Sequence, residues 1–358
     1  MQKTTIIAEA GVNHNGDIKL ALELIDVAAN AGADVVKFQT FSSESLVSAT
    51  ASKANYQKKT TDPHESQFAM LKKLELTHEQ YFILKSHSEK RHIQFLSTPF
   101  DSISADFLLK KMGLSTIKIS SGEITTAPLL LQIARYEPNI ILSTGMSTLG
   151  EIEEALAVLA FGLTQSTEKP SKNAFMKVYA SEFGQTQLRK KVTLLHCTSD
   201  YPAQFNCINL RAMDTLQSAF NLPVGYSDHS VGITVPIAAV ARGATVIEKH
   251  FTLDKSLTGP DHKTSLEPNE LKDMVESIRV VERAMGNPIK IITSEELDTK
   301  NVARKSLVAT QVIMHGELFT ENNMDTMRPG TGISAMHYWK YIGQKATKEY
   351  QIGELINE

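Results

Sequence analysis

The sequence predicts a (β/α)₈ barrel followed by a small second domain. Apolar runs of strand length recur eight times before residue 286, and segments with helical periodicity separate them. The runs are continuous rather than alternating, which is typical of a parallel sheet that helices cover on both faces. Eight strands with intervening helices indicate a TIM barrel. We therefore expect a barrel domain over residues 1–286, a linker over 287–300 and a second domain over 301–358.

The eight predicted strands follow one another in chain order. Their sequences are TTIIAEAG (4–11), DVVKFQT (34–40), IQFLSTPF (93–100), TIKISSGE (116–123), NIILSTGM (139–146), VTLLHCTSD (192–200), PVGYSDHS (223–230) and TVIEKHF (245–251). Two of the helices between them have recognisable starts. Thr77 with Gln80, and Thr148 with Glu151, have the spacing of capping boxes.

Composition excludes several classes of protein. The chain has 358 residues, of which 42% are hydrophobic and 22% charged, as in an ordinary globular protein. A formal net charge of −3 gives no reason to expect nucleic acid or a membrane surface as a partner. The sequence shows neither a signal peptide nor an apolar run near the roughly 20 residues of a membrane span. Two cysteines make neither a disulfide framework nor a zinc site, so we expect a cytoplasmic protein.

Polar side chains collect where the predicted strands end. Active sites of (β/α)₈ barrels lie at the carboxyl ends of the strands, and each of the eight runs has its polar residues last. A single Ser or Thr there can merely cap the next helix, but capping does not explain lysines inside apolar strands. The strand-end residues are Glu9, Lys37, Gln39, Thr98, Lys118, Ser120, Ser121, Ser143, Thr144, His196, Thr198, Ser227, Asp228, His229, Glu248 and His250.

Two histidines at the ends of neighbouring strands predict a metal site. His229 ends the seventh run and His250 the eighth, and each stands close to an acidic residue. Two imidazoles without a nearby cysteine leave room for water and substrate oxygens, which suits Mn²⁺ or Mg²⁺ better than structural zinc. Alternation along the strand places Glu248 on the same face as His250 and turns Lys249 the other way.

Three segments outside the strands and helices are long. Residues 42–78 and 252–268 follow the second and eighth strands, on the face where an active site belongs, and loops of this length are often functional. Residues 161–191 precede the sixth strand and so belong to the opposite face, where we expect a solvated excursion. The second domain has a marginal core for its size and should dock on another surface; its loop MRPGTGIS contains Arg328.

Nine segments in order resemble the bacterial sialic acid synthase family. They are IIAEAGVNHNGD, ADVVKFQTF, STPFD, KISSGEIT, ILSTGM, LLHCTSDYP, GYSDHS, VIEKHFTLDK and GPDHK. The resemblance covers nearly the whole chain and includes a C-terminal antifreeze-like (SAF) domain with the motif MRPGTGIS. It implies a transferase that joins phosphoenolpyruvate (PEP) to an N-acylated six-carbon sugar, giving a nine-carbon sugar acid and phosphate. The acceptor stays open between the sugars used by N-acetylneuraminate and N,N′-diacetyllegionaminate synthases.

The resemblance also implies roles for individual residues. It places Lys37, Thr98, Lys118, Ser121, Ser143 and Ser227 in the PEP pocket, with Thr144 as an alternative to Ser143. It implies sugar contacts from Gln39, Tyr201, Glu248 and Asp261, and from Arg328 of the partner subunit in a domain-swapped homodimer. It implies Glu9 as general acid and base, and a catalytic metal on His229 and His250, usually Mn²⁺, with Mg²⁺ or Co²⁺ as alternatives. Two lysines suit the charge of PEP, because a phosphate alone carries about two negative charges.

Two functions of other classes stay open at this point. A class I aldolase or lyase would form a Schiff base between Lys118 or Lys37 and a keto-acid, and borohydride would trap it. A non-catalytic protein could bind sugars through the second domain. Binding alone, however, requires neither the histidine pair nor Glu9.

Overall fold

The computed structural model describes the chain except residues 1–2, 49–50, 54–56, 58–60, 63 and 358. The chain divides into two compact units, Met1–Gly286 and Asn287–Glu358. Each unit has its own hydrophobic core, so each is described by itself.

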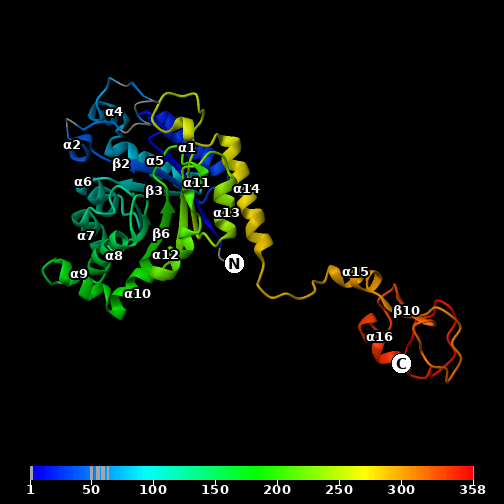
Figure 1. The fold of residues 1–358 in the computed structure, drawn as a ribbon. Helices are drawn as coiled ribbons and strands as arrows, with labels where there is room; N and C mark the ends of the chain where they lie inside the picture. Colours follow the sequence, from blue (N-terminus) through cyan, green and yellow to red (C-terminus); the bar gives the residue numbers. More distant parts are fainter. Residues whose placement is uncertain (1–2, 49–50, 54–56, 58–60, 63, 358) are drawn as a thin grey trace. The chain divides into compact units, whose positions relative to one another are not determined.

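Eight parallel strands form a barrel in the first unit, and they coincide with the eight predicted runs (Figure 1). The strands are β1 (Thr5–Gly11), β2 (Val35–Thr40), β3 (Gln94–Pro99), β4 (Thr116–Ile119), β5 (Asn139–Ser143), β6 (Val192–Cys197), β7 (Val224–Asp228) and β8 (Val246–His250). They pair in the order β3-β2-β1-β8-β7-β6-β5-β4, and β3 also contacts β4, so the sheet nearly closes. The predicted (β/α)₈ barrel is confirmed.

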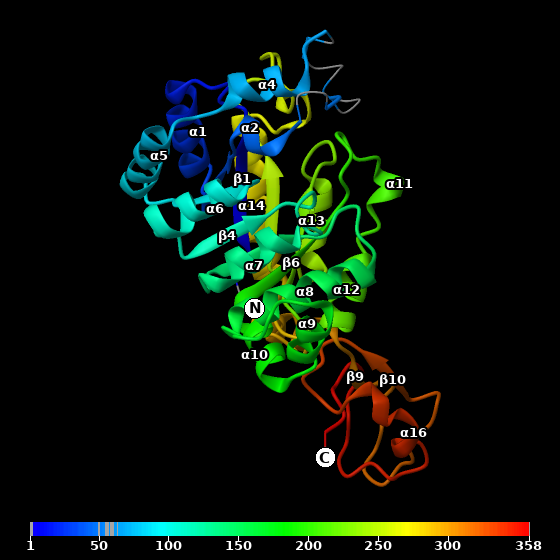
Figure 2. The same cartoon turned by 90° about the vertical axis from the view of Figure 1, so that its left-hand side faces the viewer.

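Helices surround this sheet (Figure 2). They are α1 (Ile18–Asn30), α2 (Ser43–Leu46), α4 (Gln67–Leu74), α5 (His78–Lys90), α6 (Ser102–Asp106), α7 (Ala127–Arg135), α8 (Leu149–Leu163), α9 (Lys172–Tyr179), α10 (Glu182–Lys191), α11 (Phe205–Ile208), α12 (Ala212–Phe220), α13 (Thr234–Ala241) and α14 (Pro268–Met285). Both predicted capping boxes, Thr77 with Gln80 and Thr148 with Glu151, are present. None of the helices within the described residues has both the length and the apolar character needed to cross a membrane.

A layer of six apolar side chains fills the lower part of the barrel. They are Ile7, Val35, Leu96, Ile141, Leu195 and Val246, one from each of six strands. Because side chains alternate along a strand, the residue two positions later points into the barrel as well. Those next residues are Glu9, Lys37, Thr98, Ser143, Cys197 and Glu248. The strand register thus places one layer of functional side chains directly above a packed apolar floor.

The expectation for residues 161–191 was wrong. Helix α8 continues to Leu163, and α9 and α10 pack against it rather than extending into solvent. The rings of Phe161 and Phe175 meet edge to face at 5.1 Å, and Leu188 is fully buried. Apolar residues at helical spacing give the segment a buried face. The polar composition of the segment as a whole does not reveal this face.

The second unit contains a short antiparallel pair, β9 (Ser306–Ala309) and β10 (Met324–Met327), with α16 (Tyr338–Tyr341). Its core consists of Leu307, Ala309, Ile313, Phe319, Met324, Ala346, Tyr350 and Ile356. Helix α15 (Glu296–Ala303) runs across the predicted boundary between the linker and the second domain. The antifreeze-like character of this unit stays a prediction.

Candidate active site

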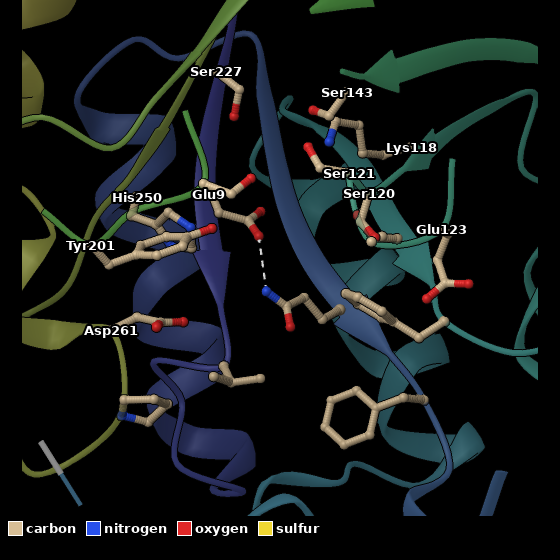
Figure 3. Close-up of a pocket in the computed structure, with 18 of the residues that line it drawn as sticks. Glu9, Lys118, Ser120, Ser121, Glu123, Ser143, Tyr201, Ser227, His250 and Asp261 are labelled. Carbon is tan, nitrogen blue, oxygen red and sulfur yellow. Dashed lines mark hydrogen bonds between the residues drawn. The ribbon is translucent and has the colours of Figure 1, made fainter. Parts of the chain in front are cut away.

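A cavity of about 480 Å³ opens at the carboxyl ends of the strands (Figure 3). Its volume is typical of a site for small molecules. All the predicted site residues of the barrel line it, namely Glu9, Lys37, Gln39, Thr98, Lys118, Ser121, Ser143, Tyr201, Ser227, His229, Glu248, His250 and Asp261. The structure therefore brings together residues from all eight strands or the loops after them.

Two lysines and two glutamates form a buried charge cluster at the base of the cavity. Lys37 Nζ lies 2.9 Å from Glu9 Oε2 and 3.6 Å from Glu248 Oε2. Lys118 Nζ lies 3.5 Å from the other Glu248 oxygen. All four residues are at most 5% exposed. Isolated charges at this depth would be very costly, so the cluster depends on its mutual pairing.

The pKa values of the two carboxyl groups in this cluster shift in opposite directions. Burial raises the pKa of Glu9, and the negative charge of Glu248 adds to that rise, although Lys37 opposes it. At Glu248, burial also acts to raise the pKa, but Lys118 and Lys37 outweigh it and lower the pKa to about 2. A pair of carboxyl groups with pKa values pushed apart indicates distinct roles. Glu9, whose pKa is raised, is the better suited of the two to act as a general acid and base.

The two lysines also differ. Burial lowers the pKa of Lys118. At Lys37, burial has the same tendency, but the carboxylates of Glu248 and Glu9 outweigh it and raise the pKa. Lys37 is therefore the more firmly held positive charge of the two.

Hydroxyl groups line the cavity beside the lysines. The Ser143 hydroxyl is buried and has no hydrogen-bond partner within the described part of the chain. Thr144, the alternative at this position, turns away from the cavity and donates to the Leu195 carbonyl at 2.9 Å. Ser143 is thus the residue that faces the cavity. Lys37 donates to the Thr98 hydroxyl at 3.1 Å.

The two histidines lie close together with nitrogen atoms available for a metal. Their ring centroids are 5.7 Å apart. His229 Nδ1 lies 2.8 Å from the Thr198 carbonyl, which only accepts, so Nδ1 carries the proton and Nε2 presents a lone pair. His250 Nδ1 is buried without a partner among the described residues, and burial together with His229 lowers the pKa of His250 well below its ordinary value. His250 is therefore neutral, as a ligand must be.

This pair fits an open metal site rather than a closed one. Nowhere in the described ranges does a group of three or more His, Cys, Asp or Glu side chains form a ready ligand set. The remaining coordination positions would belong to water and substrate oxygens, as in catalytic metal sites. At His229, burial lowers the pKa, but the Cys197 sulfur outweighs it and raises the pKa, so a metal ion would compete with a proton there.

Tyr201 and Asp261 complete the side of the cavity next to the histidines (Figure 3). The Tyr201 ring lies against His229, with centroids 4.1 Å apart. Asp261 is buried, and burial followed by the charge of Glu9 raises the pKa of its carboxyl to about 6. Both side chains thus line the part of the cavity next to the histidine pair.

Arg328 is the predicted site residue that does not line this cavity. It belongs to the second unit, where it is exposed and its Nε donates to the Ala303 carbonyl at 3.0 Å. Its part in the sugar site stays a prediction.

Sequence reasoning assigned no role to several residues that line the cavity. One of them is Cys197, which lies between the predicted strand-end residues His196 and Thr198. Its side chain belongs to the same inward-facing layer as Ser143 and Glu248. Glu123 follows β4 in the predicted strand-end motif. Further additions include apolar residues of the connection after β2, whose sequence offers no strand periodicity: Leu46, Val47, Met70, Leu71 and Leu74.

Comparison with known proteins decides the family. The model of the NeuB family matches residues 24–290, well over half of the chain. The chain belongs to the NeuB family. It is 52% identical to an N,N′-diacetyllegionaminic acid synthase of Campylobacter jejuni subsp. jejuni serotype O:2, over 100% of both chains. It is 42% identical to the Legionella pneumophila protein of the same name, over 98% of this chain and 92% of that one.

A solved structure agrees with this membership of the NeuB family. The N-acetylneuraminic acid (sialic acid) synthetase of Leptospira borgpetersenii serovar Hardjo-bovis, in complex with citrate, superposes with a TM-score of 0.66. The two proteins are 34% identical, and the match covers 83% of this chain and 90% of that one. The predicted resemblance to sialic acid synthases is confirmed.

Proposed function

We propose that this NeuB family protein condenses PEP with an N-acylated six-carbon sugar, giving a nine-carbon sugar acid and phosphate. The observation that carries the proposal is the single cavity that joins the lysine–glutamate cluster to the histidine pair. The names of its Campylobacter and Legionella relatives support N,N′-diacetyllegionaminate as the product. The acceptor would then be 2,4-diacetamido-2,4,6-trideoxymannose rather than N-acetylmannosamine.

In this proposal Lys37 and Lys118 bind the phosphate and carboxylate of PEP. These lysines now pair with Glu9 and Glu248, so an arriving anion exchanges one set of charge contacts for another. Thr98, Ser121, Ser143 and Ser227 line the same region and would add hydrogen bonds. Charge-assisted bonds of this kind are roughly twice as strong as neutral ones.

His229 and His250 would hold the divalent metal, with Mn²⁺ as the first candidate. When bound, the ion would polarise the aldehyde oxygen of the open-chain sugar as a Lewis acid. Tyr201, Asp261, Gln39 and Glu248 border this position and would bind the sugar's hydroxyl and amide groups. The sugar aldehyde and C3 of PEP would thus be held face to face.

Glu9 would move the protons of the reaction. The C3 carbon of PEP attacks the aldehyde carbon, and the aldehyde oxygen takes up a proton, which Glu9 can supply because burial raises its pKa. Water then adds at C2 and gives a proton back to Glu9. The bond between C2 and the phosphate oxygen then breaks, the hydroxyl on C2 gives its proton to the leaving phosphate, and C2 becomes the ketone of the product.

Further assignments belong to the same proposal. Arg328 would contact the N-acyl group of the sugar from the partner subunit of a domain-swapped homodimer. The second unit would be the antifreeze-like domain, and the enzyme would work in the cytoplasm.

A direct assay tests the proposed function. The purified protein is incubated with PEP, Mn²⁺ and either acceptor, while phosphate release and the mass of the product are measured. We expect a nine-carbon acid and loss of turnover with a chelator. With PEP labelled by ¹⁸O in the bridging position, the label should leave with phosphate, because the C–O bond breaks. Absence of any product with both acceptors would contradict the proposal.

One observation favours a second candidate. Burial lowers the pKa of Lys118, and a lysine with a depressed pKa is suited to Schiff-base formation. A class I aldolase would be inactivated by borohydride in the presence of a keto-sugar acid and would keep its activity in chelator. We expect neither result.

A further inference from the structure

The cavity changes from polar to apolar on the side of the first three strands. Along β2 and the residue after it, Lys37, Gln39 and Phe41 face the cavity in turn, because alternate residues share a face. Val12, just after β1, lines the cavity as well. After the other strands the lining is mostly polar, with Ser199, Tyr201 and Asp261, although Met146 and Pro260 also contribute.

The connection after β2 completes this apolar side. Met70 and Leu74 of α4 pack with Val12 and Phe41 into one cluster, and all four residues also line the cavity. We call these four residues the apolar wall; they are 4–8% exposed. Leu46, Leu71 and Phe100 pack against the wall and line the cavity as well.

Polar contacts at its edges hold the wall in place. The backbone N–H of Ser42, just before α2, donates to Asp101 Oδ2 at 3.0 Å. The Ser43 hydroxyl donates to Glu75 Oε1, just after α4, at 2.5 Å. Both ends of the segment that carries Leu46 and Met70 are thereby fastened, so the wall is a built surface of the cavity.

The direction of the bound sugar follows from the proposed function, on which this inference rests. With PEP on the lysines and the aldehyde at the histidines, the base of the cavity is filled. The sugar carbons farthest from the aldehyde must then run outward past Gln39. Outward from Gln39 on the same strand face lies Phe41, and the wall around it.

We propose that the apolar wall contacts C4 to C6 of the acceptor and selects sugars whose distal carbons carry methyl groups. A C6 methyl and the methyl of a C4 acetamido group can be buried against Phe41 and Met70. A free hydroxyl at C4 or C6 that packs against these apolar side chains would lose its hydrogen bonds to water. Discrimination by an apolar surface of this kind is on the order of 10- to 100-fold in kcat/KM.

The test compares two acceptors, 2,4-diacetamido-2,4,6-trideoxymannose and N-acetylmannosamine, at saturating PEP and Mn²⁺. The wild-type enzyme should prefer the trideoxy sugar about 10- to 100-fold in kcat/KM. Met70→Gln makes the wall polar at nearly constant volume and should reduce this preference several-fold, while the KM for PEP stays unchanged. Leu71→Gln, on the partly exposed side of α4, provides a second variant with little risk to folding.

Matched control variants distinguish an effect of the apolar wall on acceptor preference from a general effect on folding. Met70→Leu keeps the wall apolar and should keep the preference. Met112→Gln makes the same chemical change at a methionine of equal 4% exposure that lies in the main core, away from the cavity, and should leave the ratio unchanged.

Each outcome decides a separate point. Equal use of both sugars by the wild-type enzyme, or a preference for N-acetylmannosamine, would overturn the selectivity. A preference that survives in both glutamine variants would overturn the role of the wall while leaving the proposed function intact. If neither sugar is consumed, the proposed function itself fails, and the inference fails with it.

Discussion

Lys249 Nζ lies 2.6 Å from Asp228 Oδ2, and the two side chains are only 1% and 0% exposed. Lys249 stands between Glu248 and His250 on β8 but points away from the cavity, as the strand alternation predicts. It also donates to the Ser230 carbonyl. This ion pair joins the ends of β7 and β8 from outside the barrel, directly behind the two histidines.

Lys249→Met should therefore weaken both the fold and the metal site. Removing one partner of a buried pair leaves the Asp228 charge unbalanced, which typically costs about 3–5 kcal/mol in unfolding free energy. Adding Asp228→Asn should recover part of this loss, because the remaining Asn is neutral. Urea unfolding measures the stability, and titration calorimetry measures the Mn²⁺ affinity.

As a control, Lys255→Met disrupts a half-exposed pair with Glu270 and should cost under about 1 kcal/mol in unfolding free energy. Equal losses in the two lysine variants would contradict the argument.

His250→Ala should remove metal binding while leaving the barrel folded. The imidazole lies at the cavity, above the apolar floor, so its loss leaves the packed layers intact. Titration calorimetry with Mn²⁺ should show a loss of affinity of at least 10-fold, and condensation should cease. His64→Ala, at an exposed histidine, should bind Mn²⁺ like the wild type. Wild-type affinity in the His250 variant would show that the pair does not hold the metal.

Lys118→Met should impair PEP binding more than sugar binding. The side chain is buried beside Glu248 and would make charge-assisted contacts to PEP, worth roughly 1.5–3 kcal/mol. The KM for PEP should rise by about 10- to 150-fold, with a smaller change for the acceptor. Lys85→Met, on α5 and outside the cavity, serves as the control. An unchanged KM for PEP would mean that Lys118 has only a structural role.

His14 should make stability depend on pH in the acid range. Its Nδ1 accepts a hydrogen bond from the Gly16 N–H at 3.0 Å, so the folded state requires the unprotonated nitrogen. Burial, and then the nearby His262, lower the pKa of His14 from 6.5 to about 4. Because the folded pKa lies below the unfolded one, this contribution is complete above pH 6.5 and is lost as the pH falls towards 4.

The loss attributable to His14 should be at most about 3 kcal/mol. Urea unfolding between pH 4 and 8 measures it, with His14→Gln as the reference, since glutamine accepts a hydrogen bond but does not titrate. The wild-type and variant curves should converge as the pH falls. Parallel curves would show that His14 does not titrate as inferred. His262→Gln checks the second histidine, whose pKa burial also lowers to about 4.

Arg328 should complete the site of a neighbouring subunit. Glu9→Gln and Arg328→Ala should each inactivate the enzyme alone. In a domain-swapped mixed dimer both lesions can fall in one site and leave the other site intact, so partial activity should return after subunit exchange. Absence of complementation despite demonstrated exchange, or full activity of a strict monomer, would rule out this arrangement.

The strands and the chemical character of the site were predictable because their signals are local. Each strand shows as an apolar run, and its polar end follows directly in the sequence. The choice between Ser143 and Thr144 was not predictable in this way. Adjacent residues point to opposite faces, and only the closed barrel defines which face is inside.

The apolar wall and the packing of residues 161–191 could not be predicted from the sequence either. Phe41 and Met70 are 29 positions apart, in a connection that reads as polar and without periodicity, yet they share one cluster. In the same way, the buried side of α9 and α10 depends on contacts with α8.

The sequence by itself determined the (β/α)₈ barrel, the family and the set of strand-end residues. These properties follow from the hydrophobic pattern, the strand register and short motifs, which all lie within a few residues of one another. Only the tertiary structure decided that Glu9 pairs with Lys37, that Lys249 pairs with Asp228, and that an apolar wall faces the outer cavity. Those relationships depend on distances between strands and loops far apart in the chain, which are set by the closure of the barrel and the packing around it.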